Sequence, residues 1–227
     1  EKFIEKLKIA NPNKGRLKEE TLYLLYRSGI VIDSSNLERK LSYETPDYNF
    51  YFLRAQDIPY LISQKVVDCG ITGLDIMEEF ENTDIKPLLN LSYGNTKMVV
   101  ASKNSCFKNC TSPIKMKVAT SFPHITKKFF KTKNIDIDIV YLTGSVEIAP
   151  ALGIADAIVD ITETGKTLKD NGLTILDEVL SSEAALIFDV NIDKQKYLQL
   201  FKLKKSLSSA IKPQSKILQL NETISSL

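Results

Sequence analysis

The sequence lacks the features that mark membrane, secreted or nucleic-acid-binding proteins. It has no apolar run long enough to span a bilayer. The start of the chain lacks the apolar core of a secretory signal peptide. The formal net charge is only +2, so no strong field attracts a polyanion. We therefore predict that the chain has neither nucleic-acid nor membrane partners.

Cysteine and histidine are scarce. Three cysteines are an odd number and do not suggest a disulfide framework. Cys106 and Cys110 have C-x₃-C spacing, but with one other cysteine and one histidine in the chain we predict no zinc site. Cys69 lies in an apolar segment and is expected to be a small core residue. The lone His124 follows a proline at a predicted helix start, which favours a capping or surface role over a catalytic triad. This usage predicts a reducing, cytoplasmic location.

What is present is the composition of an ordinary globular protein. The chain has 227 residues, 43% hydrophobic and 26% charged, which fits one large domain or two small ones. Strand and helix signals alternate, which predicts an α/β fold with largely parallel sheets. The predicted strands are 7–10, 50–53, 66–71, 88–93, 97–102, 115–120, 137–142, 157–161, 173–179 and 184–190. The predicted helices are 18–28, 57–65 with Asp57 as its N-cap, 72–79, 123–133, 145–152, 165–171 and 193–211.

Two αβ series meet near residues 93–97, and strands return near residue 180. This order predicts two αβ lobes around a cleft. We place residues 1–95 in lobe I, with 180–227 returning to it, and residues 96–179 in lobe II. Ligands of such folds lie beyond the carboxyl ends of the strands.

The most informative stretch is LTGSVE (residues 142–147) followed by ADAIVDITETGKTL (155–168). It predicts a buried strand ending in a carboxylate, a Thr/Gly/Lys loop and a helix start. Loop amides and hydroxyls at a helix start can hold a phosphate, and the carboxylates could hold sugar hydroxyls or Mg²⁺. An ordinary strand–turn–helix would also fit, but this context favours a sugar-phosphate site.

Three further clusters follow predicted strands: NKGRL (residues 13–17), LRAQDIP (53–59) and DCGITGLD (68–75). Gly15 permits a tight turn after which Lys14 and Arg16 could point into the cleft. Arg54 follows a strand and precedes a helix start, where it could meet an anion. Each cluster alone also fits a structural turn, but their joint presence at successive strand ends favours a binding site. A GxGxxG fingerprint and a Walker A motif are both absent.

These motifs resemble the ATP phosphoribosyltransferases, which catalyse the first step of histidine biosynthesis. The resemblance is carried by the five segments NKGRL, LRAQDIP, DCGITGLD, TGSVEIAP (143–150) and ADAIVDITETGKTL, in order along most of the chain. It implies a fold similar to the two-lobed type II periplasmic binding proteins. It also implies attack of adenine N1 of ATP on C1 of phosphoribosyl pyrophosphate, with pyrophosphate released and substrate-bound Mg²⁺ required.

The resemblance implies a role for each matching residue. The implied catalytic residues are Arg16, Arg39, Glu147 and Asp160. Those implied to bind phosphoribosyl pyrophosphate are Asp160, Glu163, Thr164, Gly165, Lys166 and Thr167, and those for ATP are Arg16, Leu17, Arg54, Gln56 and Asp75. Two positions depart from the family pattern, because a basic residue is frequent where Gln56 stands and arginine where Lys166 stands.

The chain ends soon after the last predicted helix, whereas long family members continue into a histidine-binding regulatory domain. It thus resembles the short form of the family. The short form implies self-association and a hetero-octamer with a regulatory partner similar to histidyl-tRNA synthetase. Two alternatives remain at this point: a non-catalytic two-lobed small-molecule binding protein, and a glycosyltransferase or kinase with another acceptor.

Overall fold

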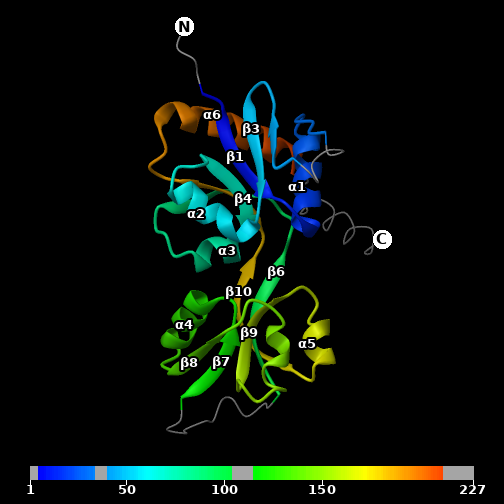
Figure 1. Cartoon of the computed structure of the whole chain (residues 1–227), viewed down its shortest axis with the longest axis vertical. Helices are drawn as coiled ribbons and strands as arrows, with labels where there is room; N and C mark the ends of the chain where they lie inside the picture. Colours follow the sequence, from blue (N-terminus) through cyan, green and yellow to red (C-terminus); the bar gives the residue numbers. More distant parts are fainter. Residues whose placement is uncertain (1–4, 34–39, 104–114, 212–227) are drawn as a thin grey trace, which may run out of the picture.

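The computed structural model describes residues 5–33, 40–103 and 115–211, arranged in an upper and a lower half (Figure 1). The upper half holds a six-stranded sheet in the order β2-β3-β1-β4-β11-β5. Its strands are β1 (Leu7–Pro12), β2 (Ser42–Glu44), β3 (Tyr48–Leu53), β4 (Cys69–Gly73), β5 (Ile85–Asn90) and β11 (Ala184–Asp189). Its helices are α1 (Gly15–Arg27), α2 (Ile58–Ser63), α3 (Leu74–Glu79) and α6 (Lys194–Ala210), with a 3₁₀ turn η2 (Ala55–Asp57) before α2.

The lower half holds a five-stranded sheet in the order β10-β6-β9-β7-β8. Its strands are β6 (Thr96–Ser102), β7 (Met116–Thr120), β8 (Ile137–Tyr141), β9 (Ala157–Thr162) and β10 (Thr174–Ser182). Its helices are α4 (Pro123–Thr132) and α5 (Lys166–Asp170), with a 3₁₀ turn η4 (Val146–Ile148). No helix in the described residues is long and apolar enough to cross a membrane.

Both sheets are mixed, so the prediction of largely parallel sheets is wrong. β1 pairs in parallel with β3 and β4, and β7 with β8 and β9. β11 runs antiparallel to β4 and β5, and β6 antiparallel to β9. β11 enters the upper sheet from the junction between the halves, where β1 and β4 end, so it must run opposite to them. β6 enters the lower sheet from the same junction, where β9 ends, so β6 must run opposite to β9.

Apolar side chains cover both faces of each sheet, as a sheet between helices requires. On β1, Ile9 packs toward α1 and α6, while the next residue, Ala10, packs toward α2. The predicted apolar stripe of the last helix is largely confirmed, because Leu200, Leu203, Leu207 and Ala210 are buried, while Tyr197 stays 39% exposed. Cys69 is fully buried in this core, and burial raises the pKa of its thiol.

Several local predictions are wrong. Residues 145–152 form only the short turn η4, because Pro150 has no N–H with which to continue a helix. Asp57 does stand at the N-cap position of α2, as predicted, but its backbone angles are helical because η2 precedes α2, and its side chain makes no capping hydrogen bond. Residues 66–68 form a bend before β4, and the strand predicted at 88–93 is β5, which begins at Ile85 and ends at Asn90. The short strand β2 was not predicted.

Candidate active site

Two of the predicted site residues, Arg16 and Glu163, meet where the two halves meet. The loop after β1 and the loop after β9 touch, because Arg16 Nη1 donates to Glu163 Oε2 at 3.0 Å. Lys97 at the start of β6 pairs with Thr162 at the end of β9, so the strand that enters the lower sheet holds this loop at the junction. The carboxyl ends of strands from both sheets thus face each other, as expected for ligand sites in α/β folds.

Arg16 lies in the first turn of α1, after Gly15, whose φ of +71° makes the tight turn that was predicted. Its Nε donates to Glu20 Oε1 at 2.6 Å, one helical turn further on. The hydrogen bond from Arg16 to Glu20 and the nearby charge of Glu163 raise the pKa of the guanidinium. The side chain remains 64% exposed, so it can also reach an anion at the junction.

The predicted phosphate loop is open to solvent at the end of β9. Gly165 has φ +75° and caps α5, and its N–H donates to Thr162 Oγ1 at 2.8 Å. Lys166 N–H points to Thr164 Oγ1 at 3.4 Å. The first-turn amides of a helix have no partner inside the helix, so Thr167 can offer both its amide and its hydroxyl. Thr162, which shapes this loop, was not among the predicted site residues.

Asp160 and Glu147 lie close together beside the loop. Asp160 is on β9, and Glu147 is on η4, which packs against β9. Burial raises the pKa of Asp160 and the neighbouring charge of Glu147 adds to this, while the N–H of Ile161, which donates to Asp160 Oδ1 at 2.8 Å, opposes it. Glu147 and Asp160 are therefore adjacent carboxyl groups, and burial makes the ionised form of Asp160 unfavourable.

The residues predicted to bind ATP differ in exposure. Arg54 and Gln56 follow β3 and are exposed, and Thr72 Oγ1 donates to the Ala55 carbonyl at 2.9 Å, which fastens this turn to β4. Leu17 is half-buried and reaches the backbone of Gly94 near the start of β6. Arg54 and Gln56 are thus open to a ligand, and Leu17 lines the joint between the halves.

Asp75 is only 6% exposed. Ser182 Oγ donates to Asp75 Oδ1 at 2.9 Å, and the Asp75 N–H donates to Ser182 Oγ at 3.0 Å. Ser182 is the last residue of β10, so this pair fixes α3 to the strand that leaves the lower sheet. Arg39, Cys106 and Cys110 lie outside the described residues.

A second set of contacts joins the halves through α3 and α4. The Glu79 carboxylate accepts the N–H of His124 and that of Ile125, each at 3.0 Å. His124 Nδ1 lies 2.9 Å from Glu81 Oε2, so this histidine lies at a helix start and bonds acids of the other half. The sequence alone did not single out Glu79.

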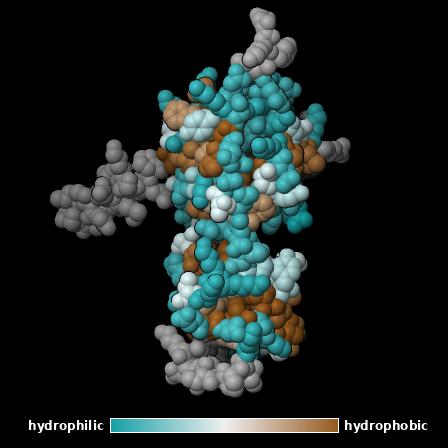
Figure 2. All heavy atoms as spheres, turned by 90° about the vertical axis from the view of Figure 1, so that its left-hand side faces the viewer, coloured by the Kyte–Doolittle hydropathy of each residue, from teal (hydrophilic) through white to brown (hydrophobic). Residues whose placement is uncertain are grey.

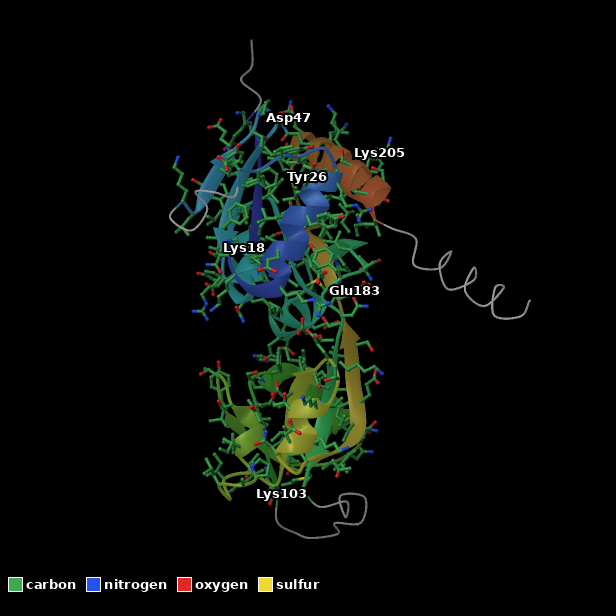
Figure 3. All side chains as sticks on the ribbon, turned by 90° about the vertical axis from the view of Figure 1, so that its right-hand side faces the viewer. Lys18, Tyr26, Asp47, Lys103, Glu183 and Lys205 are labelled. Atoms are coloured by element: carbon green, nitrogen blue, oxygen red, sulfur yellow. The ribbon has the colours of Figure 1, made fainter. Side chains whose placement is uncertain are left out.

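A cavity of about 840 Å³ lies beside these contacts, between α3 and β5 above and α4 and β10 below. Its apolar lining includes Met77, Phe129 and Leu180, and none of the predicted site residues lines it. Figure 2 shows the α3 and α4 side of the molecule, where apolar atoms gather on the lower half. Figure 3 shows the opposite side, where Lys18 lies on α1 and Glu183 lies at the junction.

Comparisons with known proteins identify the family of this chain. The family model described as HisG: ATP phosphoribosyltransferase matches residues 54–209, more than half of the chain. The ATP phosphoribosyltransferase of Campylobacter fetus subsp. fetus is 40% identical over 206 residues, covering 90% of this chain and 99% of the relative.

Solved structures share the fold. The ATP phosphoribosyl transferase (HisG:HisZ) complex from Thermotoga maritima contains a chain with TM-score 0.78 and 30% identity, covering 90% of this chain and 98% of that one. Tv2483 bound to L-arginine has TM-score 0.53 at 14% identity, covering 96% of this chain and 86% of that one. The predicted α/β fold of the type II binding-protein kind is confirmed. The chain belongs to the ATP phosphoribosyltransferase family.

Proposed function

We propose that the junction between the halves is the site at which the chain transfers a 5-phosphoribosyl group to N1 of the adenine of ATP. The donor is phosphoribosyl pyrophosphate, and the products are pyrophosphate and N1-(5-phosphoribosyl)-ATP, as in the first step of histidine biosynthesis. The observation that carries this assignment is the Arg16–Glu163 contact. It brings the predicted phosphoribosyl loop of one half against the predicted ATP-side arginine of the other.

The lower half is proposed to hold the phosphoribosyl group. The 5′-phosphate would lie in the loop of Glu163, Thr164, Gly165, Lys166 and Thr167, held by amides, hydroxyls and the Lys166 charge. Asp160 would orient the ribose hydroxyls, with Glu147 beside the reacting carbon. The exposure of this loop supports the proposal, because it leaves the amide and hydroxyl of Thr167 and the charge of Lys166 accessible to a phosphate.

The upper half is proposed to hold ATP and the leaving pyrophosphate. Arg16, Arg39 and Arg54 would neutralise phosphate charge, with Gln56 beside them. Leu17 and Asp75 would shape the ATP site by packing at the junction between the halves, because Leu17 is half-buried and Asp75 is buried. The two halves are proposed to be the lobes set by residues 1–95 with 180–227 and by residues 96–179.

The chemistry needs alignment more than proton transfer. The N1 lone pair forms the new N1–C1 bond while the C1–O bond to pyrophosphate breaks and its electrons leave with that oxygen. Positive charge builds on the ribose, where Glu147 and Asp160 are adjacent, and negative charge builds on pyrophosphate near the arginines. Holding N1 and C1 in line can supply several orders of magnitude in rate.

We also propose that Mg²⁺ enters with the substrates. No group of three or more His, Cys, Asp or Glu side chains forms a metal cage within residues 5–33, 40–103 and 115–211. The adjacent carboxylates of Glu147 and Asp160 fit Mg²⁺, which is usually held by one or two carboxylates together with substrate phosphates. The ion would neutralise the departing pyrophosphate.

A regulatory partner and a cytoplasmic location complete the proposal. The similar Thermotoga maritima chain was solved in a HisG:HisZ complex, which supports a partner of the HisZ kind for this chain. The expected assembly is a hetero-octamer with a histidyl-tRNA-synthetase-like subunit and self-association of this chain. The non-catalytic binding protein is not favoured, because a transferase relative is matched over 99% of its length.

The test mixes the purified chain with ATP, phosphoribosyl pyrophosphate, Mg²⁺ and pyrophosphatase, with and without the HisZ-type partner. N1-alkylated adenine is followed by its near-ultraviolet absorbance. Glu147→Gln and Asp160→Asn should lower turnover at least tenfold, the scale of losing one electrostatic group, whereas the exposed Asp170→Asn should not change it. Unchanged turnover in both site variants would reject the site, and no product with a bound partner would reject the reaction.

A further inference from the structure

Glu79 joins the two halves at a place that the proposed substrates do not use. It is the last residue of α3 in the upper half, and its partners open α4 in the lower half. Figure 1 shows α3 and α4 on one side of the molecule, and α1 and α5 on the other. The contact therefore lies on the flank opposite Arg16 and Glu163.

The contact uses both oxygens of one carboxylate. Oε1 accepts from His124 N–H and Oε2 from Ile125 N–H, each at 3.0 Å. First-turn amides of a helix lack partners within the helix, and the positive end of the helix dipole favours an anion. Glu79 thus supplies a charge-assisted cap for α4 from the other half of the molecule.

The electrostatic surroundings show that this cap is a costly arrangement. Burial raises the pKa of Glu79, while hydrogen bonds from Ile125 and His124 lower it. The charge of His124 also favours the carboxylate, and that of Glu81 opposes it. The cavity of about 840 Å³ beside this contact means that apolar packing does not fill this flank. The Glu79 contact and the His124–Glu81 pair therefore bridge the two halves beside this cavity.

We propose that Glu79 is a positioning residue for the transfer reaction, which fixes the angle between the halves so that N1 of ATP meets C1 of the donor. This inference rests on the proposed function. Each substrate is held mainly by a different half, so the angle between the halves sets the distance between the reacting atoms. The two oxygens of Glu79 are already used by amides, so it acts without touching substrate.

The Arg16–Glu163 pair on the other flank cannot fix the angle between the halves during turnover. Both side chains are exposed, and both are proposed to bind substrates. When substrates take these side chains, the pair opens, but the Glu79 bonds to α4 remain. The α4 start is also filled by Glu79, which leaves the loop after β9 to receive the 5′-phosphate.

The experiment compares Glu79→Ala and Glu79→Gln with Glu78→Ala and Glu78→Gln, in the complex that shows wild-type activity. Glu78 is the neighbouring acid on α3 and makes no contact with α4 amides among the described residues. Glu79→Ala should lower kcat by about 10- to 100-fold, the scale of a misalignment of about 1 Å. The KM values for ATP and phosphoribosyl pyrophosphate should stay within about twofold, since binding within each half is intact.

Rescue by formate distinguishes a positioning role of Glu79 from a merely structural one. It should bind the freed amides of His124 and Ile125 and restore part of kcat in Glu79→Ala, but not in wild type. Small-angle scattering should show a larger or more variable radius of gyration for this variant with both substrates present. Glu79→Gln, which keeps one acceptor oxygen, should lie between wild type and Glu79→Ala.

Three outcomes would overturn the inference while wild type stays active: an unchanged kcat in Glu79→Ala, a loss confined to KM, or an equal loss in Glu78→Ala. If Glu79→Ala does not fold, Glu79→Gln decides by the same kcat and KM criteria. An inactive wild-type complex would instead reject the proposed function. The two failures are thus distinguishable.

Discussion

Arg16 Nη1 lies 3.0 Å from Glu163 Oε2, although the two residues are 147 positions apart in the sequence. Arg16 opens α1 in the upper half, and Glu163 follows β9 in the lower half. Each side chain is proposed to belong to a substrate site, so the pair competes with the substrates for both groups. On this proposal, substrate binding would break the contact between Arg16 and Glu163.

Arg16→Ala should separate stability from activity. The two side chains are 64% and 54% exposed, and exposed ion pairs contribute less than about 1 kcal/mol. Thermal denaturation should therefore change little, while turnover falls by at least tenfold through loss of anion stabilisation. Arg27→Ala, on the same helix, serves as the control with full turnover. Full turnover in Arg16→Ala would remove Arg16 from the site.

Gly165→Ala should damage phosphate binding more than folding. The φ of +75° costs a non-glycine residue about 1–2 kcal/mol, and the added Cβ would meet only Ile175 Cδ1 at 3.6 Å. Gly153→Ala carries the same backbone strain at φ +72° in open space. Both variants should lose similar free energy of unfolding, but only Gly165→Ala should raise KM for phosphoribosyl pyrophosphate. An equal KM in both would argue against the phosphate loop.

Asp160→Asn should stabilise the substrate-free protein while it lowers turnover. Burial raises the pKa of Asp160, so its ionised form is less favourable in the folded protein than in the unfolded chain. This cost is absent below the ordinary aspartate pKa of about 3.9 and grows as the pH rises through the folded-state pKa. The Tm of Asp160→Asn should thus exceed that of wild type at pH 7.5, and the gain should shrink as the pH falls toward 4.

The control for this pH series is Asp170→Asn, which removes an exposed carboxylate from the same half. Its Tm difference from wild type should be small at every pH. A Tm for Asp160→Asn below that of wild type at pH 7.5 would contradict the prediction. Such a result would mean that the ionised carboxylate stabilises the fold.

Ser182→Ala should destabilise the joint between α3 and β10. Ser182 Oγ donates to Asp75 Oδ1 and accepts from Asp75 N–H, and Asp75 is only 6% exposed. A buried carboxylate that loses its partner costs about 1–3 kcal/mol. Urea denaturation should show this loss in Ser182→Ala and not in the neighbouring, exposed Ser181→Ala. A loss below about 0.5 kcal/mol would mean that Asp75 finds another partner.

The motifs predicted the turn at Gly165 and the α/β class because both depend on local patterns. Glycine at position 165 marks a turn after an apolar strand, and the alternation of strands and helices predicts two αβ series. Asp75 shows the limit of this reasoning. Its motif places it beside a strand end, but only its contact with Ser182, 107 positions away, reveals that it is buried.

Glu79 shows the limit more sharply. Nothing in its local sequence distinguishes it from Glu78, because both lie at the end of the same short helix. Its role follows from the approach of α4, which depends on how β6 and β10 carry the chain between the two sheets.

The sequence by itself determined the chemical groups, the strand–loop–helix units that carry them and the family. These follow from turn chemistry and hydrophobic periodicity, which act over a few residues. The tertiary structure alone decided the direction of β6 and β11, the pairing of Arg16 with Glu163 and the cap of Glu79 on α4. These depend on contacts between segments far apart in the chain, whose geometry is set by packing of the whole fold and not by local propensity.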